Sequence, residues 1–359
     1  MHLTKLKLRD FRNIRELDAA FEPGFHVLLG RNAQGKTNLL EAVYLLATLR
    51  SFRGVGNAQL IRHEQKAFFA GGLALGQAES EIRYYWSPDQ RKLTVNEKPM
   101  RRITDYLGTL RTVVFCAEDS LLVNGPGKSR RRFLDLLLTQ SQPGYLELLH
   151  RYTEALRSRN ALLRRDSPDP ALIDSFTREL VANGEQLIAA RRQLVDKLSP
   201  IIRLAYRKIA AKPENADITY APSVREDLAV SLAKSRPREQ RYRTTLVGPH
   251  RDELKLTLDG QSAVQYASEG QKRTFAIALK IAQAEYLGGI HGSPPILLID
   301  DVMGELDAGR RAGLMPLISR TGQALGQVFM TCTEENWPGE LSGNLHRWQI
   351  EQGSLKRMI

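Results

Sequence analysis

The sequence contains few features of secreted or membrane-bound proteins. Only two of its 359 residues are cysteines, Cys116 and Cys332, and each stands beside apolar residues at the end of a predicted strand. Such thiols are typical of buried reduced side chains and argue against a disulfide framework or a metal site. No uncharged run approaches the roughly 18 residues that a membrane span needs, and the N-terminal MHLTKLKLRDFRN has no uninterrupted apolar core. We expect a cytoplasmic protein with no secretory signal and no membrane partner.

Glycine is scarce in the middle of the chain. Between residues 128 and 247 only Gly144 and Gly184 occur. A long stretch with so few helix breakers favours helices. Apolar residues at steps of three and four predict amphipathic helices within it, over 130–140, 145–165 and 171–210. No heptad seam of coiled-coil length is present, so we predict a compact helical arm.

Strand signals flank this helical stretch on both sides. They predict strands over 81–87, 92–100, 112–117, 253–260, 296–300 and 327–332. The fold class expected is therefore α/β, with a P-loop ATPase head built from both ends of the chain and a mainly helical insertion. The predicted boundaries are 1–125 for the first half of the head, 126–243 for the arm or lid, and 244–359 for the second half.

The sequence GRNAQGKT follows a short apolar strand and precedes residues with helical periodicity. Its spacing, Gly30-x-x-x-x-Gly35-Lys36-Thr37, is that of a phosphate-binding loop. The glycines let backbone N–H groups turn toward a phosphate chain, and the helix directs its positive end to the same point. A plain strand-to-helix turn has no need for Lys-Thr here. We predict that Lys36 is catalytic and contacts the β- and γ-phosphates, and that ATP is bound by Gly30, Arg31, Asn32, Ala33, Gln34, Gly35, Lys36, Thr37 and Asn38.

A second acidic motif lies far along the chain. The apolar run ILLID ends in the adjacent carboxylates Asp300 and Asp301. Asp300 is placed to hold Mg²⁺ together with the Thr37 hydroxyl, directly or through water. Asp301 is placed to orient or deprotonate an attacking water, which makes it the second predicted catalytic residue. A strand that ends in solvated acids is the structural alternative.

A third motif precedes a long helical segment. Ser268-x-x-Gln271 has the spacing of a capping box at a helix start. The order Ser268-Glu269-Gly270-Gln271 also resembles the signature motif of ABC-type ATPases. Both interpretations hold together, because a capped helix start is a natural site for a phosphate.

The ordered set of these motifs, followed by Gly304-Glu305-Leu306-Asp307, resembles the ABC ATPase head of the SMC group. In that group the signature serine of one subunit contacts the nucleotide in the P-loop of another. The resemblance therefore implies an ATP-dependent homodimer, with residues 268–271 acting in trans and Asp307 in the D-loop that lines the seam.

Further stretches resemble the RecF family of bacterial recombination mediators. They run in order along the chain as LKLRDFRN, LRSFRG, FCAEDSLLVNGPGKSRRRFLD, RNALL, TLVGPHRDEL and YASEGQKRT. The resemblance implies a nucleoid-associated protein of DNA repair, replication and the SOS response, with weak DNA-dependent ATPase activity. It implies binding to duplex, gapped and junction DNA, loading of recombinase, and RecR and RecO as partners.

Some positions depart from the ABC pattern. Asp301 replaces the usual glutamate and is one methylene shorter, which implies slow hydrolysis. No histidine follows the strand at 327–332, where Thr331 or Thr333 is the nearest substitute for a γ-phosphate sensor. Glu118 and Asp119 stand where a glutamine is usual. These departures count against a transporter ATPase subunit.

Basic residues outnumber acidic ones by 52 to 40, a net charge of +12. The excess suggests a polyanionic partner, although an acidic membrane surface is equally consistent. Each basic cluster alone fits a solvated helix face, but several lie in or beside the predicted arm. Together they predict contacts to DNA backbone phosphates without base reading. The candidate DNA-binding residues are Lys128, Arg130, Arg131, Arg132, Arg191, Arg192, Arg203, Arg207 and Lys208.

Three other functions share part of this motif set. A transporter ATPase subunit shares the nucleotide motifs but has no use for a long basic insertion. A P-loop kinase leaves residues 268–271 unexplained. An architectural head of the SMC type differs mainly by its very long coiled coil. His250, in GPHRDE, is either functional or fixes a turn, and the turn is favoured slightly.

Overall fold

The computed structural model describes residues 1–76, 78–167, 169–210, 212–224, 226–323, 326–332 and 345–358. The chain divides into two compact units. Unit 1 comprises Met1–Asp119, Ala205–Pro213 and Ala276–Ile359, and unit 2 comprises Ser120–Leu204 and Glu214–Phe275. In the described residues, no helix is both long enough and apolar enough to span a membrane.

Unit 1 contains an antiparallel sheet of six strands in the order β2-β1-β4-β5-β6-β7. In β1 the buried Leu6 and Leu8 alternate with the exposed Lys7 and Arg9, which gives this strand one apolar face, as expected in an antiparallel sheet. The first two strands form a tight hairpin at Arg12 and Asn13, and residues 87–90 join β5 to β6. The strand bounds are β1 (His2–Phe11), β2 (Ile14–Ala20), β4 (Phe68–Leu75), β5 (Glu79–Trp86), β6 (Arg91–Val95) and β7 (Lys98–Pro99).

The second sheet of unit 1 is mainly parallel and has the order β15-β14-β3-β13-β12-β8. Only β15 pairs antiparallel, in a hairpin with β14. Its central strands are buried along their whole length, as expected for a sheet covered on both faces. The bounds are β3 (Gly24–Leu29), β8 (Thr112–Phe115), β12 (Ile296–Asp300), β13 (Gln327–Cys332), β14 (Leu345–Glu351) and β15 (Ser354–Arg357).

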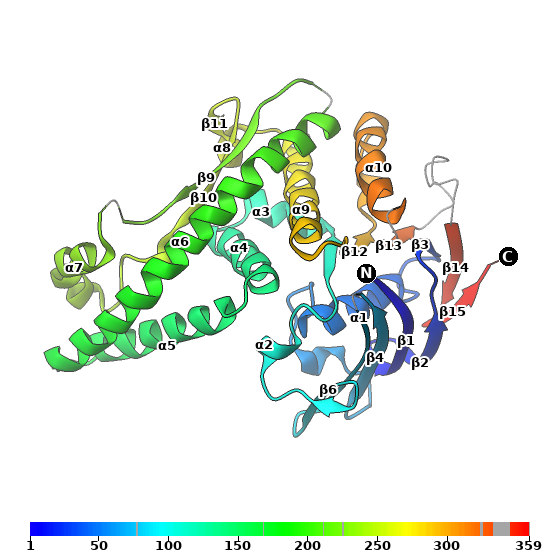
Figure 1. The fold of residues 1–359 in the computed structure, drawn as a ribbon, viewed down its shortest axis with the longest axis horizontal. Coiled ribbons are helices and arrows are strands. Elements are labelled where there is room, and N and C mark those ends of the chain that lie inside the picture. Colours follow the sequence, from blue (N-terminus) through cyan, green and yellow to red (C-terminus); the bar gives the residue numbers. More distant parts are fainter. Residues whose placement is uncertain are drawn as a thin grey trace. The chain divides into compact units, whose positions relative to one another are not determined.

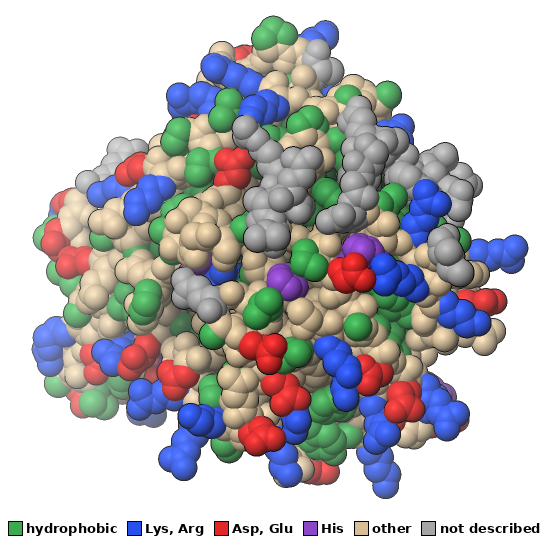
Figure 2. All heavy atoms as spheres, turned by 45° about the vertical axis from the view of Figure 1, so that its right-hand side comes forward, with side chains coloured by type: hydrophobic (Ala, Val, Ile, Leu, Met, Phe, Trp, Pro, Cys, Tyr) green, Lys and Arg blue, Asp and Glu red, His purple; other side chains and the backbone are tan. Residues whose placement is uncertain are grey.

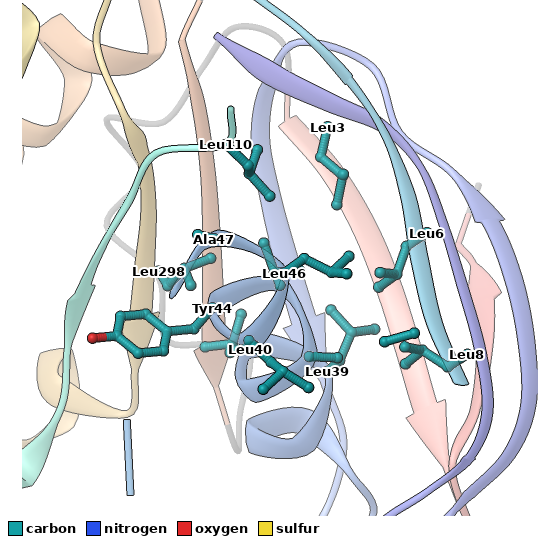
Figure 3. Close-up of a cluster of buried hydrophobic side chains, with 14 of the residues drawn as sticks. Leu3, Leu6, Leu8, Leu39, Leu40, Tyr44, Leu46, Ala47, Leu110 and Leu298 are labelled. Atoms are coloured by element: carbon teal, nitrogen blue, oxygen red, sulfur yellow. The ribbon is translucent and has the colours of Figure 1, made fainter. Parts of the chain in front are cut away.

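The helix α1 (Lys36–Thr48) packs against both sheets of unit 1, and α10 (Ala308–Gln323) packs against β3 and β13. Leucines at helical steps in α1 meet Leu3, Leu6 and Leu8 of β1 and Leu298 of β12 in one core (Figure 3). The helical periodicity of the residues that follow the loop is thus confirmed. The short helices of this unit are η1 (Asn57–Leu60), α2 (Ile103–Tyr106), η2 (Ala117–Ser120) and η4 (Val302–Glu305).

Unit 2 is mainly helical, as predicted, and Figure 1 shows its long helix α6 in green. The predicted helices over 130–140, 145–165 and 171–210 correspond to α4 (Gly127–Ser141), α5 (Tyr145–Leu163) and α6 (Pro170–Ile209). The Asp227 side chain caps α7 by accepting from two backbone N–H groups. The other helices are α3 (Leu121–Asn124), α7 (Leu228–Tyr242), η3 (Pro249–Arg251) and α8 (Ala263–Tyr266). The helix α9 (Glu269–His291) begins in unit 2 and continues into unit 1 from Ala276.

Unit 2 also contains a small antiparallel sheet, β11-β10-β9, with bounds β9 (Ala216–Ala221), β10 (Glu253–Leu258) and β11 (Gln261–Ser262). Its pairing explains why the compact units differ from the predicted boundaries. β10 was expected in the head, but it pairs with β9 from the predicted arm. Residues 244–275 therefore group with unit 2, while 205–213 group with unit 1.

Candidate nucleotide site and signature segment

The candidate nucleotide site lies at one edge of the mainly parallel sheet. β13 pairs with both β3 and β12, so the carboxyl ends of these three strands are adjacent. The loop of residues 30–35 leaves β3, and Asp300 ends β12. Ligands of open α/β sheets bind at this edge, where loops diverge from the strand ends. The fold thus brings together two motifs more than 260 positions apart, Thr37 and Asp300.

Glycine is required at both ends of the loop. Gly35 has φ +114 and is the N-cap of α1, a backbone conformation that other residues rarely adopt. A Cβ on Gly30 would approach the carbonyl oxygen of Ile350 to 2.4 Å. Lys36 opens the helix, is buried, and donates from Nζ to the carbonyl oxygens of Gly30 at 2.5 Å and Arg31 at 3.1 Å. Burial lowers the pKa of Lys36, and the nearby Asp301 and Asp300 oppose that shift.

Oxygen atoms of two motifs meet at the start of α1. Thr37 Oγ1 donates to Asp300 Oδ1 at 2.8 Å, and Thr331 Oγ1 donates to the same oxygen at 3.0 Å. Burial raises the pKa of Asp300, and the neighbouring Asp301 and Glu118 carboxylates act in the same direction. The hydrogen bonds from the two threonines oppose this shift. A hydroxyl and a half-buried carboxylate in contact form the oxygen donor set that Mg²⁺ prefers, so the residues fit that ion.

Asp301 lies one residue beyond this contact and is exposed. Its φ of 56° is in the left-handed region, which turns the chain sharply as it leaves β12. Its backbone N–H donates to Thr331 Oγ1 at 2.9 Å. The carboxylate of Asp301 is thereby presented outward beside the oxygen pair of Thr37 and Asp300.

Two hairpin turns support the phosphate loop, and neither contact is predicted by the sequence motifs. Asn13, in the β1–β2 turn, accepts from Asn38 Nδ2 at 2.8 Å and contacts the Ala33 carbonyl at 3.5 Å. The β14–β15 turn donates two backbone N–H groups to Gln34: Gly353 N to its carbonyl oxygen at 2.9 Å and Gln352 N to its Oε1 at 2.7 Å. The side chain of Gln34 therefore anchors the loop instead of pointing at a phosphate.

The residues that stand in place of the usual glutamine and the γ-phosphate-sensing histidine differ from one another in burial and in partners. Asp119 accepts from the Cys116 N–H at 2.9 Å and lies 3.5 Å from Lys280 Nζ, so its carboxylate is engaged in a buried ion pair. Glu118 is exposed. Thr331 is buried with both of its hydroxyl functions in use, and Thr333 lies outside the described residues.

The signature segment forms the predicted capping box at the start of α9. Ser268 N donates to Gln271 Oε1 at 2.7 Å, and Gln271 N donates to Ser268 Oγ at 3.3 Å. Gln271 also donates from Nε2 to Glu214 at 2.8 Å, which fixes its amide. Ser268 and Glu269 are exposed and Gly270 is half-buried. The hydroxyl of Ser268 is therefore held at an exposed helix N-terminus.

Asp307 caps the next helix. Its Oδ1 accepts from Arg310 N at 2.9 Å, and its Oδ2 forms an ion pair with the Arg310 guanidinium. The backbone hydrogen bond and the guanidinium hold the pKa of Asp307 below its ordinary value. Asp307 is exposed in this position.

Two of the candidate DNA-binding residues are structural, and the prediction was wrong for them. Arg130 is buried and forms a bidentate pair with Glu253, at 2.7 and 3.0 Å. Arg191 is buried and forms a bidentate pair with Asp135, at 2.9 Å for each bond. A buried guanidinium paired in this way cannot reach a phosphate without leaving a carboxylate unpaired. Helix periodicity could have indicated the burial of Arg191. It lies four residues after the buried Leu187 and therefore on the same face of α6.

The other candidates lie nearer the surface. Arg131 is half-buried and donates to the Asp252 carbonyl at 2.7 Å. Arg203 lies 3.3 Å from Asp217 in an exposed ion pair. The exposed candidates are Lys128, Arg132, Arg192, Arg203, Arg207 and Lys208. On the face of the molecule in Figure 2, Lys and Arg side chains are interspersed with Asp and Glu and form no single basic patch.

His250 fixes local structure. Its Nδ1 accepts from the Tyr152 hydroxyl at 2.7 Å, and its Nε2 donates to the Thr245 carbonyl at 3.2 Å. Burial lowers the pKa of His250 to about 4, so the ring is neutral at physiological pH. These contacts agree with the favoured interpretation that His250 holds the turn at η3.

The layers of unit 1, the P-loop between β3 and α1, and the acidic end of β12 define an ABC-type ATPase head. The family model for the RecF/RecN/SMC N-terminal domain matches residues 2–351. A solved SMC head domain from Pyrococcus furiosus has a TM-score of 0.60 over 99% of this chain and 96% of that one. At 15% sequence identity, that likeness concerns the fold alone.

Closer similarity points to one branch of this class. The DNA replication and repair protein RecF of Geotalea daltonii is 34% identical over 99% of this chain and all of the relative. RecF of Symbiobacterium thermophilum is 37% identical over 95% of each chain. A structure of the recombination mediator protein RecF with ATP has a TM-score of 0.91 at 30% identity, covering 100% of this chain and 98% of that one. The chain belongs to the RecF family.

Proposed function

We propose that this chain is an ATP-driven switch that acts on DNA in repair and replication. The observation that carries the proposal is the 2.8 Å contact between Thr37 Oγ1 and Asp300 Oδ1 at the end of a phosphate-binding loop. It supports ATP binding by the backbone of residues 30–38 with Mg²⁺ held by Thr37 and Asp300. When bound, Mg²⁺ neutralises charge on phosphate oxygens.

Each residue of the site has a distinct task in this proposal. Lys36 Nζ, which lies on the loop carbonyls, exchanges those contacts for the β- and γ-phosphates. The exposed carboxylate of Asp301 takes a proton from, or orients, the attacking water. Its short side chain favours slow hydrolysis, as suits a switch more than a metabolic enzyme.

A second copy of the chain completes the site. The exposed, capped N-terminus of α9 offers the Ser268 hydroxyl and the positive end of the helix to the γ-phosphate held by the partner's loop. Residues 268–271 and Asp307 would then line the seam. Loss of the γ-phosphate removes this bridge, so hydrolysis separates the two copies.

DNA is the polyanion that fits the net charge of +12 and the names of the relatives. The proposed contacts are Lys128, Arg131, Arg132, Arg192, Arg203, Arg207 and Lys208, without Arg130 and Arg191. They would contact backbone phosphates of duplex, gapped and junction DNA. The solved RecF structure named for the RecFOR pathway supports RecR and RecO as partners in recombinase loading. A nucleoid-associated cytoplasmic location would follow from binding to DNA. The SMC-like fold keeps an architectural head as the second candidate.

The deciding experiment is sedimentation with Mg²⁺ and ATP, using the variants Lys36→Ala and Ser268→Ala. Lys36→Ala should bind no nucleotide and stay monomeric. Ser268→Ala should bind ATP within about threefold of the unaltered chain and fail to dimerise, although loss of the cap costs about 1 kcal/mol of stability. Dimers of Ser268→Ala at the same ATP concentration would reduce Ser268 to a helix cap. DNA affinity that is indifferent to ATP would exclude the switch and favour the architectural head.

A further inference from the structure

The Thr331 hydroxyl connects the two carboxylate positions of the site. It lies at the end of β13, and its residue is only 1% exposed. Oγ1 donates to Asp300 Oδ1 at 3.0 Å and accepts from the backbone N–H of Asp301 at 2.9 Å. The Ile299 carbonyl, at 3.5 Å, is a more distant acceptor for the same proton. A hydroxyl has one proton to donate, and the ionised carboxylate is the nearer and stronger acceptor.

The sheet fixes where this hydroxyl lies. β13 is between β3 and β12, with Thr331 in register with Leu28 on one side and Asp300 on the other. Thr331 is therefore set by three parallel strands, whereas Asp301 belongs to the turn after β12 and has a φ of 56°. A left-handed turn in a non-glycine residue persists only when its surroundings hold it. The hydrogen bond from Asp301 N to Thr331 is such a contact.

We propose that Thr331 is a positioning residue that holds both Asp300 and Asp301 in working geometry. Its donated hydrogen bond selects the direction of the Asp300 oxygens toward Thr37. Its accepted hydrogen bond fixes the turn that presents the Asp301 carboxylate. The proposal rests on the functions proposed above for these two aspartates. It also replaces the predicted role of Thr331 as a γ-phosphate sensor, since both functions of its hydroxyl are already in use.

The chain provides a matched control in the same sheet. Thr112 on β8 is also 1% exposed, and β8 pairs with β12 on the side opposite β13. Among the described residues, the Thr112 hydroxyl has no hydrogen-bond partner. Thr331→Val and Thr112→Val therefore delete the same atom at equal burial, and they differ in the contacts that are lost. Thr331→Ser keeps the hydroxyl and serves as the rescue variant.

The first measurement needs no nucleotide. Hydrogen exchange of a peptide that contains Asp301 should show a protected amide in the unaltered chain, in Thr331→Ser and in Thr112→Val. In Thr331→Val this amide should exchange at least about tenfold faster, because its acceptor is gone. Unchanged protection in Thr331→Val would overturn the proposal, since the turn would then be held by something else.

The second measurement separates binding from hydrolysis. Partners that orient a metal ligand typically change metal affinity or activity by about 10–100-fold when removed. Thr331→Val should bind ATP normally in EDTA, lose about tenfold in the Mg²⁺-dependent gain in affinity, and lose about 10–100-fold in kcat. Thr331→Ser should recover to within about threefold, and Thr112→Val should match the unaltered chain.

The outcomes distinguish this proposal from the proposed function. If the unaltered chain neither binds nor hydrolyses ATP while the exchange result holds, the ATPase function fails and the positioning of Asp301 stands. If the unaltered chain is active and Thr331→Val has the same Mg²⁺ dependence and kcat, the positioning role is wrong. Equal losses in Thr331→Val and Thr112→Val would also overturn it, because the effect would then belong to the sheet and not to the contacts.

Discussion

The buried charges at the nucleotide site of unit 1 serve a different purpose from the buried ion pairs of unit 2. In unit 1 the core around α1 is mainly aliphatic and aromatic, with structural ion pairs between Arg12 and Glu41 and between Lys280 and Asp119. The buried Lys36 lies with half-buried Asp300 at the nucleotide site. In unit 2 guanidinium groups are buried as structural ties, with Arg159 paired to Glu239 and Arg191 to Asp135. A phosphate loop requires particular residues at fixed spacing, so its motif identifies a site. An excess of arginine carries no such constraint and can mark either a surface or a core.

The largest expected effect is loss of a tie in unit 2. Arg159 is 1% exposed and donates to Glu239 at 2.6 Å, Thr245 at 2.8 Å and Thr177 at 2.9 Å. Arg159→Met should reduce the free energy of unfolding by about 3–5 kcal/mol, because Glu239 is left buried and unpaired. Urea denaturation measures this change. Arg157→Met, on the exposed side of the same helix, should stay within about 0.5 kcal/mol, and similar losses for both variants would refute the distinction.

The next effect concerns pH and tests both units. Burial lowers the pKa of His26 in unit 1 and of His250 in unit 2 to about 4. The unfolded chain binds a proton at each histidine below about pH 6.5, and the folded chain does so only near pH 4. The free energy of unfolding should therefore fall as the pH falls between these values, by up to about 3 kcal/mol per histidine.

The variant His250→Gln shows how much of this pH dependence comes from His250. It removes one of the two titrating histidines, so the free energies of unfolding at pH 7 and pH 4.5 should differ less in the variant than in the unaltered chain. His26 is held neutral by burial, with its Nδ1 accepting from the Trp348 indole at 3.0 Å, and its share of the slope should persist. A pH dependence identical in both chains would show that His250 is not held neutral by the fold.

A smaller effect tests the support of the phosphate loop in unit 1. Gly353 has φ +78, and a Cβ there would approach the Asn13 carbonyl oxygen to 2.6 Å. Gly260 in unit 2 has φ +79 with nothing within 4 Å of its Cβ position. Both alanine variants bear the left-handed cost of about 1–2 kcal/mol. Only Gly353→Ala should also weaken ATP binding, by about tenfold in a titration. Equal ATP affinities of Gly353→Ala and Gly260→Ala would show that the β14–β15 turn does not support the phosphate loop.

The smallest expected effect is at the surface of unit 2. Arg192 follows Arg191 directly and is exposed. Arg192→Ala should change stability by less than about 0.5 kcal/mol. If Arg192 contacts one phosphate, the plot of log K for duplex DNA against log salt should become less steep in the variant, with the magnitude of its negative slope smaller by about 0.9. An unchanged slope would remove Arg192 from the DNA surface.

The sequence predicted most where chemistry imposes spacing. The P-loop, the acidic strand end and the capping box at Ser268 all follow from local patterns, and the structure contains the predicted elements in each case. Strand pairing depends on distant residues, so the grouping of β10 with β9 was missed. Likewise, nothing in the local sequence at Gln352 and Gly353 indicates contact with a loop more than 300 positions earlier.

The same strand order constrains how the protein is made. β3, which leads into the phosphate loop, is flanked in its sheet by β13 and β14, and both are translated after residue 326. While the ribosome is still synthesising the middle of the chain, β3 has neither sheet neighbour, although its leucines have already emerged. The nascent polypeptide therefore completes the sheet around the phosphate loop only after β13 and β14 have been synthesised.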